Sequence, residues 1–283
     1  MDDPGEILYH LPRRVAGLRS GAHRGMAAGS ALEFLAHRRL FDHPDPRRLD
    51  LRASVADLRG DWLVRINRHR AAVTVQVIVD VSASMRFGEP AKLALAADFV
   101  ESLARSAFRI GDAVGLLAFD AAARDDLHVA PRHGRGVGAT LAARLRGCES
   151  GPGGIAGLRD AARQVGPRPA LVFLVSDFLW PLDGLGDILD GLAPAHVVPL
   201  VLVDAAESEP PARDGLALLV DAETGRQRAL WVRPALRARW RETAAARRAQ
   251  LAEIFADRGL RPFTLSGAFD AQALSHHLLE DAA

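Results

Sequence analysis

The sequence predicts an α/β protein with an open, mostly parallel sheet and helices on both of its faces. Short runs rich in β-branched residues and leucine recur along the chain, as is typical of strands that are covered on both faces. Helical patterns with an apolar stripe stand between these runs. This alternation of strand and helix is the pattern of a parallel sheet built from crossover units.

The predicted strands and helices alternate between residues 73 and 204. One helix shows its stripe clearly, because Leu93, Ala97, Val100 and Ala104 recur at helical spacing. Pro199 is expected to break the ladder of the last strand, since proline has no amide hydrogen to donate. In order, we expect strand 73–79, helix 91–108, strand 111–119, a short strand 125–131, helices 136–147 and 153–166, strand 170–176, helix 183–192 and strand 196–204.

The N-terminal 70 residues show weaker patterns. "DHPDPRRLD" carries two prolines and predicts a turn. "DWLVRINRH" indicates a strand, whereas "GSALEFLAHRRLF" fits either a short amphipathic helix or an extended segment.

After residue 205 a C-terminal extension begins. "LALLVDAETGRQRALWV" predicts a β-hairpin with its turn near Glu223–Gly225. Pro234 is suited to start a long helix at 236–258, and Gly259 to cap it. "RPFTLSG" and residues 270–279 predict a last strand and a last helix. The predicted domains are therefore 1–70, 71–204 and 205–283.

The overall composition argues against several classes of protein. The net charge of +1 gives no global attraction to nucleic acid or to an anionic membrane. A single cysteine, Cys148, cannot form a disulfide within the chain and favours a reducing compartment. The N-terminus lacks the apolar region of a secretory signal, and the longest apolar runs are shorter than the about 18 residues that span a bilayer. We expect a cytoplasmic protein with no membrane span.

Acids follow three of the predicted strands, as Asp80, Asp177 and Asp204. Ligands of open parallel sheets bind beyond the carboxyl ends of the strands. A single aspartate after a strand is a turn or helix-cap residue about as often as it is part of a binding site. Asp80 is stronger because Ser82 and Ser84 follow it, and a carboxylate with two hydroxyls suits Mg²⁺ or Mn²⁺. Alternatively, Asp80 caps the next helix while the serines satisfy backbone donors.

The stretch "DVSASM" matches the D-x-S-x-S element of the metal-ion-dependent adhesion site of von Willebrand factor A domains. "GDAVGLLAF", "LVFLVSDF", "DAAESEPPARDG" and "VDAETG" then occur in the order seen in DUF58 proteins. From about Gly29 to its C-terminus the chain resembles this family, which comprises von Willebrand A-like partners of MoxR-type AAA+ ATPases. The resemblance implies that strands 73–79 and 170–176 are neighbours, so that Asp80 and Asp177 share one site.

The resemblance also implies a metal site formed by Asp80, Ser82, Ser84 and Asp177, holding Mg²⁺, or Mn²⁺ or Ca²⁺. In the family fold a threonine, commonly in G-G-T-x-x-L, is a further ligand. The counterpart here, "GGIAGL", offers Ile155, which has no oxygen to donate. Thr140 in "GATLAARL" is a second candidate that lies early in the chain. The site is therefore expected to be degenerate, with an ion bound weakly or not at all.

An upstream motif of the family is eroded. The family shows glycine, E-F and R-x-Y, followed by P-G-D-D-x-R-x-I-D-W. In this chain one glycine, one acid, the tyrosine and the tryptophan of the pattern are missing. The residues that match are Gly29, Glu33–Phe34, Arg38, Pro44, Asp45, Arg48 and Asp50.

By this resemblance the protein is a non-enzymatic interaction module. It acts with a MoxR-type ATPase in a chaperone-like complex that matures client proteins, and a client contributes an acidic ligand to the site. One branch accompanies methanol dehydrogenase assembly in methylotrophs, where calcium loading is the proposed task. Chain length alone does not select that branch.

Three other functions are alternatives to this one. The first is a metal-free scaffold, which Ile155 favours. The second is a hydrolase or phosphoryl-transfer enzyme using Asp80. Phosphoryl transfer of this kind normally uses a second acid two residues after the first, where this chain has Ser82, and the G-x-S-x-G motif of serine hydrolases does not occur. The third is nucleic-acid binding through helix 236–258, where acids interleave with the arginines as on a solvated face.

Overall fold

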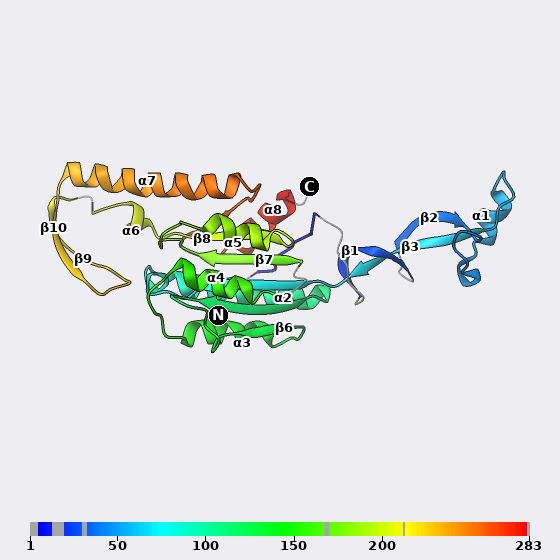
Figure 1. Cartoon of the computed structure of the whole chain (residues 1–283), viewed down its shortest axis with the longest axis horizontal. Helices are drawn as coiled ribbons and strands as arrows, with labels where there is room; N and C mark the ends of the chain where they lie inside the picture. The colour runs from blue at the N-terminus through cyan, green and yellow to red at the C-terminus, as the bar shows by residue number, and fades with distance from the viewer. Residues whose placement is uncertain (1–4, 13–19, 30–32, 167–169, 212, 282–283) are drawn as a thin grey trace. The chain divides into compact units, whose positions relative to one another are not determined.

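The computed structural model describes residues 5–12, 20–29, 33–166, 170–211 and 213–281. The chain forms two compact units, which are described separately (Figure 1). Residues Met1–His10 with Thr74–Ala283 make up the larger unit, and Leu11–Val73 make up the smaller one.

The larger unit is built on a six-stranded sheet in the order β11-β8-β7-β4-β5-β6. All neighbouring strands are parallel except β6, which runs antiparallel to β5 at one edge. This arrangement confirms the predicted α/β class and the predicted pairing of the two central strands. The strands are β4 Thr74–Asp80, β5 Ala113–Phe119, β6 Val129–Arg132, β7 Leu171–Ser176, β8 His196–Leu202 and β11 Phe263–Leu265.

Helices cover both faces of this sheet. On one face, α4 (Ile155–Arg163), α5 (Leu185–Leu192) and α7 (Pro234–Ala256) pack on Ile78, Val172 and Leu174 of the central strands. These three side chains are completely buried, and burial of each contributes about 1.5–3 kcal/mol relative to exposure. The core therefore buries the central strands up to their carboxyl ends.

On the opposite face lies α2 (Lys92–Ile110), whose Phe99 ring packs edge-on against Phe173 of β7 at 5.1 Å. The helix ends at Gly111, which has a φ of 90° and donates its amide to the carbonyls of Ala107 and Phe108. A residue with a Cβ would be strained in this left-handed conformation. The next helix, α3 (Val137–Gly147), packs against α2.

The N-terminal segment and the last helix complete the larger unit. The amide of Ile7 donates to Ser106 of α2, and the amide of Leu8 donates to Ser275 of α8 (Ala271–Asp281). Both bonds are 2.9 Å long, and the second joins segments from the two ends of the chain.

The expected break at Pro199 is wrong. Strand β8 pairs with β7 without a register shift from His196 to Val201. The amide of His196 points to β7, and since amides alternate along a strand, the nitrogen of Pro199 points to the other side. On that side, pairing with β11 begins only at Leu200. The missing donor therefore costs the sheet no hydrogen bond.

The short strand expected to stop at Pro131 instead runs through it, because β6 spans Val129–Arg132. Proline is tolerated there because β6 is an edge strand, and edge strands leave one side of the ladder unpaired.

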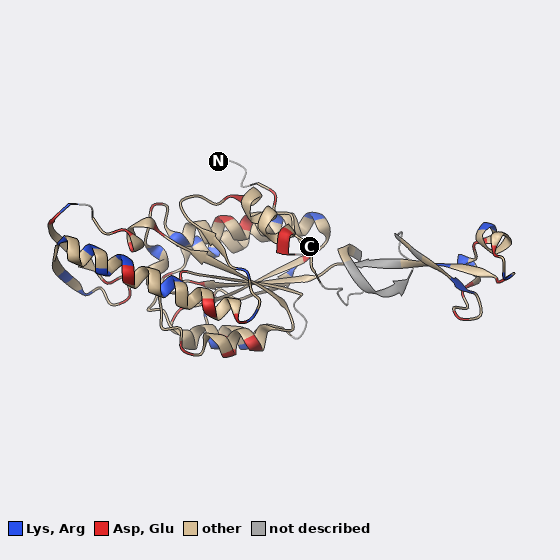
Figure 2. Cartoon of the chain, turned by 90° about the horizontal axis from the view of Figure 1, so that it is seen from above, with Lys and Arg blue, Asp and Glu red and all other residues tan. Residues whose placement is uncertain are grey.

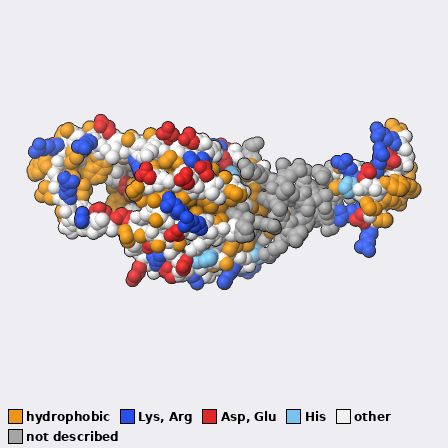
Figure 3. Space-filling model, viewed as in Figure 1, with side chains coloured by type: hydrophobic (Ala, Val, Ile, Leu, Met, Phe, Trp, Pro, Cys, Tyr) orange, Lys and Arg blue, Asp and Glu red, His pale blue; other side chains and the backbone are white. Residues whose placement is uncertain are grey.

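The C-terminal extension begins with a short helix, α6 (Ala205–Ser208). The predicted hairpin is confirmed as β9 (Gly215–Val220) paired with β10 (Gln227–Val232). The long helix α7 follows at Pro234 as expected, and basic and acidic side chains interleave along it (Figure 2). Figure 3 shows hydrophobic side chains gathered over the hairpin, where Leu216, Leu218, Val220 and Trp231 are exposed.

The smaller unit contains a three-stranded antiparallel sheet in the order β1-β3-β2. Its strands are β1 Ser20–Gly29, β2 Glu33–Arg39 and β3 Leu63–Ala71. The segment that fitted either a helix or an extended conformation is therefore extended over Glu33–Arg39, and its residues 30–32 lie outside the described residues. The motif acids Asp45 and Asp50 cap the short helices η1 (Pro46–Arg48) and α1 (Leu51–Ala56). Asp50 also accepts a hydrogen bond from His37.

Within the described ranges, no helix has both the length and the apolar character that crossing a membrane would require.

Candidate functional site

The candidate site lies where β4 and β7 end. The strands pair in register, with Val79 opposite Val175, so the residues that follow both strands emerge at one edge of the sheet. The structure thereby brings Asp80 and Asp177 together, with the Asp177 charge acting on Asp80. Ser82 and Ser84 lie on the loop that follows β4, which turns through the short helix η2 (Ala83–Arg86).

Asp80 is completely buried and held by neutral donors. Its Oδ1 accepts the amide hydrogen of Ser82 at 2.9 Å. Its Oδ2 accepts from the hydroxyl of Ser176 at 2.6 Å and from the indole Nε1 of Trp180 at 2.9 Å. Burial and the charge of Asp177 raise the pKa of Asp80 to about 6, although the hydrogen bonds from Ser176 and Ser82 counteract the rise.

Two hydroxyls lie beside this acid. The Oγ atoms of Ser82 and Ser84 are 3.2 Å apart and share a hydrogen bond. Both residues are buried. The loop before α4 packs on them, because Ala83 donates its amide to the carbonyl of Gly151 and a Cβ on Gly153 would lie 2.9 Å from that of Ser82. Only glycine fits this close approach without displacing Ser82.

Asp177 has a different partner, the ammonium group of Lys92. Lys92 is the first residue of α2, and its Nζ lies 2.6 Å from Asp177 Oδ2 and also binds Glu207 of α6. Burial alone would lower the pKa of Lys92, but the charges and hydrogen bonds of the two acids raise it. A cation at a helix N-terminus is opposed by the helix dipole, so these carboxylates are what hold it there.

The segment after β7 contains Asp177 and also Trp180, whose indole donates to Asp80. Its residue Phe178 has a φ of 53°, which is uncommon for a residue with a bulky side chain. The ring is buried and packs against Trp180 and Phe255, which offsets the strain. Arg247 of α7 donates to the carbonyls of Phe178 and Trp180. This turn is what returns the Trp180 indole to Asp80.

A carboxylate from the β9–β10 hairpin also reaches this site. Glu223, in the turn of the hairpin, accepts the amide hydrogen of Ser84 at 2.9 Å and that of Gly153 at 2.5 Å. The two donors belong to the loop after β4 and to the loop before α4.

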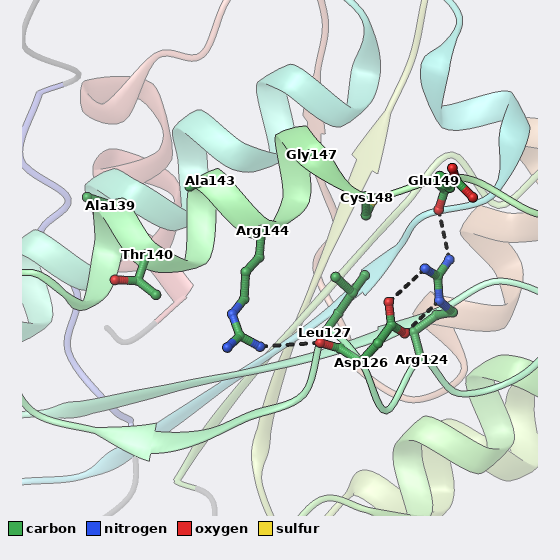
Figure 4. Close-up of a pocket in the computed structure, with 10 residues that line it drawn as sticks. All are labelled: Arg124, Asp126, Leu127, Ala139, Thr140, Ala143, Arg144, Gly147, Cys148 and Glu149. Atoms are coloured by element: carbon green, nitrogen blue, oxygen red, sulfur yellow. Dashed lines mark hydrogen bonds and ion pairs between the residues drawn. The ribbon is translucent and has the colours of Figure 1, made fainter.

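The two positions considered for a threonine ligand contribute no oxygen to this cluster. Ile155 begins α4 and packs its side chain against the apolar core. Thr140 lies on α3, where its hydroxyl donates to the carbonyl of Gly136. It lines a separate open pocket of about 860 Å³ with Arg124, Arg144 and Cys148 (Figure 4).

Two further acids at this edge are engaged elsewhere. Asp204 caps α6 by accepting the amide hydrogen of Ala206. Asp120, which follows β5, forms an ion pair with Arg124 at 2.9 Å. Sequence reasoning missed Lys92, Ser176, Trp180, Glu207 and Glu223, since no spacing rule connects them to Asp80.

The donor set fits a small hard cation only in part. In the described part of the chain, no three or more Asp, Glu, His or Cys residues are grouped so as to hold a metal. The hydroxyl pair does fit, because adjacent ligands about 2.1 Å from Mg²⁺ lie about 3 Å apart, close to the observed 3.2 Å. A cation here would therefore depend on hydroxyls, the two aspartates and water.

A family model described as "Protein of unknown function DUF58" matches residues 45–250. One relative, described as an uncharacterised protein in the moxR 3′ region of Paracoccus denitrificans, is 39% identical over 95 residues, or 34% of this chain and 90% of that protein. An uncharacterised protein of Mycobacterium tuberculosis is 29% identical over 250 residues, or 86% of this chain and 77% of that protein.

Similar solved structures include the conserved hypothetical protein BatB from Bacteroides thetaiotaomicron, with 16% identity and a TM-score of 0.45 over 75% of this chain and 99% of that one. Another is proximal thread matrix protein 1 from the mussel byssus with a zinc-occupied MIDAS motif, with 13% identity and a TM-score of 0.41 over 75% and 47% of the two chains. The fold class rests on the sheet order and helices described above.

Proposed function

This chain belongs to the DUF58 family, and on that premise we propose that it is a protein-interaction module that acts with a MoxR-type AAA+ ATPase. The observation that carries the proposal is the buried pair Asp80 and Asp177 with the Ser82 and Ser84 hydroxyls at one edge of the sheet. The relative described as encoded in a moxR 3′ region supports the choice of partner. The docking edge is the carboxyl end of β4 and β7, in the proposed 71–204 domain.

In this proposal an acidic side chain of a partner docks at that edge. The Ser82 and Ser84 hydroxyls, with Asp80 and Asp177, are the residues that would hold Mg²⁺, or Mn²⁺ or Ca²⁺. When bound, the ion would supply an electrophilic position for the incoming carboxylate. Ser176 and Trp180 orient Asp80, while Lys92 orients Asp177.

We propose no bond-breaking step at this site. Both oxygens of Asp80 already accept hydrogen bonds from Ser82, Ser176 and Trp180, an arrangement that suits orientation better than nucleophilic attack. The metal-free scaffold is a second candidate, favoured by the Lys92–Asp177 pair. In that version the ammonium group supplies the positive charge of the site.

The proposed biological role is maturation of client proteins in the cytoplasm. Metal insertion into methanol dehydrogenase is one such role. Genes beside the coding sequence would test it directly, because a methanol dehydrogenase operon would identify the client. A neighbouring AAA+ gene without that operon would support the ATPase as partner and would argue against methanol dehydrogenase as the client.

Pull-down of the host's MoxR-type ATPase by the full chain tests the proposal. We expect retention in Mg²⁺, and at least about tenfold weaker retention with Ser84→Ala or Asp80→Asn. Glu242→Ala, an exposed position on α7, is the control and should retain the ATPase fully. Retention unchanged by both site variants would reject docking at this edge. Retention lost with both variants but unchanged by EDTA would select the metal-free scaffold.

A further inference from the structure

The turn of the β9–β10 hairpin carries a carboxylate into the candidate site. Both oxygens of Glu223 accept main-chain hydrogen bonds, one from Ser84 and one from Gly153. These contacts join residues 139 and 70 positions apart in the sequence. Bonds from amide hydrogens to a carboxylate are charge-assisted and stronger than those between neutral groups. Glu223 therefore occupies a specific position on the body of the unit.

That position belongs to the docking edge itself. Ser84 supplies one of the two site hydroxyls as well as the amide that binds Glu223. Gly153 lies against Ser82, the other hydroxyl residue. The two amides are therefore carboxylate donors at the docking edge, and in this structure they are already bound to a carboxylate of the same chain.

The turn presents Glu223 in a fixed conformation. The Asp221 side chain accepts the amide hydrogens of Glu223 at 2.9 Å and of Thr224 at 3.3 Å. Gly225 has a φ of 67°, which closes the turn and which residues with a Cβ rarely adopt. The amide of Gly225 donates to the carbonyl of Asp221 at 2.8 Å. The turn is thus ordered by its own residues and does not depend on the body.

One face of the hairpin is exposed. Leu216, Leu218, Val220 and Trp231 are between 57% and 71% exposed, and the first and last of them are directly paired across the two strands. A two-stranded hairpin is marginally stable without support. An ion pair between Asp214 and Arg237 anchors its base to α7. Release of Glu223 would therefore free the tip while the base stays attached.

We propose that the Ser84 and Gly153 amides form a carboxylate-binding site, that Glu223 is its resident ligand, and that an acidic side chain of the partner binds by displacing the hairpin tip. This inference rests on the proposed docking of a partner at the same edge. It adds that the partner's carboxylate would bind main-chain amides and would compete with Glu223 for them. A tethered ligand competes at high effective concentration. The intact chain therefore binds acidic partners more weakly than a chain without Glu223.

Amide hydrogen exchange of the full chain tests whether Glu223 occupies the site. With Glu223→Ala, the amides of Ser84 and Gly153 should exchange at least about tenfold faster, and the hairpin tip, residues 219–228, should lose protection. Glu242→Ala should leave both rates unchanged. Equal rates for Ser84 and Gly153 in the wild-type chain and Glu223→Ala would overturn the proposal.

Binding of an acidic probe tests displacement. The probe is a head-to-tail cyclic peptide of residues 219–228, labelled with a fluorophore and titrated in Mg²⁺ buffer. Glu223→Ala should bind it at least about tenfold more tightly than the wild-type chain does, and a probe with glutamine in place of Glu223 should not bind. Equal affinity of the two proteins, or equal affinity for the two probes, would overturn the proposal.

These results are separable from the proposed function. The ATPase pull-down reports partner binding without reference to Glu223. If the ATPase is retained through Ser84 while exchange and probe binding are insensitive to Glu223, this inference fails and the proposed function stands. If the probe binds as expected while no ATPase is retained, the carboxylate site stands and the assigned partner is wrong.

Discussion

The ends of β4 and β7 carry the same residue type in two different electrostatic environments. Asp80 is surrounded by the neutral donors Ser82, Ser176 and Trp180, and among the described residues it has no ion-pair partner. Asp177, on the neighbouring strand, pairs with the buried ammonium of Lys92. Hydrogen bonds therefore orient the first acid, whereas a resident cation compensates the second.

This difference shows which acid of the cluster lacks a compensating positive charge. Lys92 balances Asp177 in part, while burial raises the pKa of Asp80 because no cation offsets its charge. An added cation would gain most beside Asp80 and the two serine hydroxyls.

Replacement of Lys92 should destabilise the fold most. In Lys92→Met, the buried Asp177 and the partly exposed Glu207 lose their cation, and loss of one partner of a buried ion pair such as Lys92–Asp177 costs about 3–5 kcal/mol. Urea denaturation of the full chain measures this cost. Lys92→Met with Asp177→Asn should recover part of the loss. A cost below about 1 kcal/mol for the single variant would show that Asp177 is compensated by something other than Lys92.

The pH dependence of stability should report Asp80. Its pKa in the fold is about 6, above the ordinary value of 3.8, so folding favours the protonated acid. This contribution is complete below about pH 4 and is lost as the pH rises through about 6, which lowers stability by roughly 1–3 kcal/mol. Thermal denaturation in EDTA from pH 4 to 7 tests it. Asp80→Asn should remove this fall, and a fall that persists in that variant would assign it to another group.

Removal of the indole donor should have an intermediate effect. Trp180→Phe keeps an aromatic ring but leaves Asp80 Oδ2 with one donor fewer, which costs about 1–3 kcal/mol for a buried carboxylate. Trp231→Phe, at an exposed position of the hairpin, is the matched control. Denaturation midpoints that shift equally in the two variants would mean that the indole does not support Asp80.

Loss of one hydroxyl should affect stability least and cation binding most. Among the described residues, the Ser84 hydroxyl forms a hydrogen bond only with the Ser82 hydroxyl, so Ser84→Ala should change stability by less than about 1 kcal/mol. Calorimetric titration with Mg²⁺ should show at least about tenfold weaker binding than in the wild-type chain. Equal Mg²⁺ affinity in the two proteins would remove the hydroxyl pair from the metal site.

Much of the larger unit could be predicted from the sequence. Strand and helix patterns depend on residues close together in the chain, so β4, β7, the hairpin and α7 were predictable within a few residues. The error at Pro199 shows the limit of local reasoning. Whether a missing amide matters depends on where the neighbouring strand begins, and β11 lies more than 60 residues further along the chain.

Local patterns were enough to predict the fold class and to select Asp80, Ser82, Ser84 and Asp177, because buried strands and the residues that follow them are recognisable from neighbouring residues alone. The partners of these four residues are set by the tertiary structure. Lys92 reaches Asp177 across 85 positions, Trp180 reaches Asp80 across 100, and Glu223 reaches Ser84 across 139. Contacts of this kind depend on packing between distant segments, which no local spacing encodes.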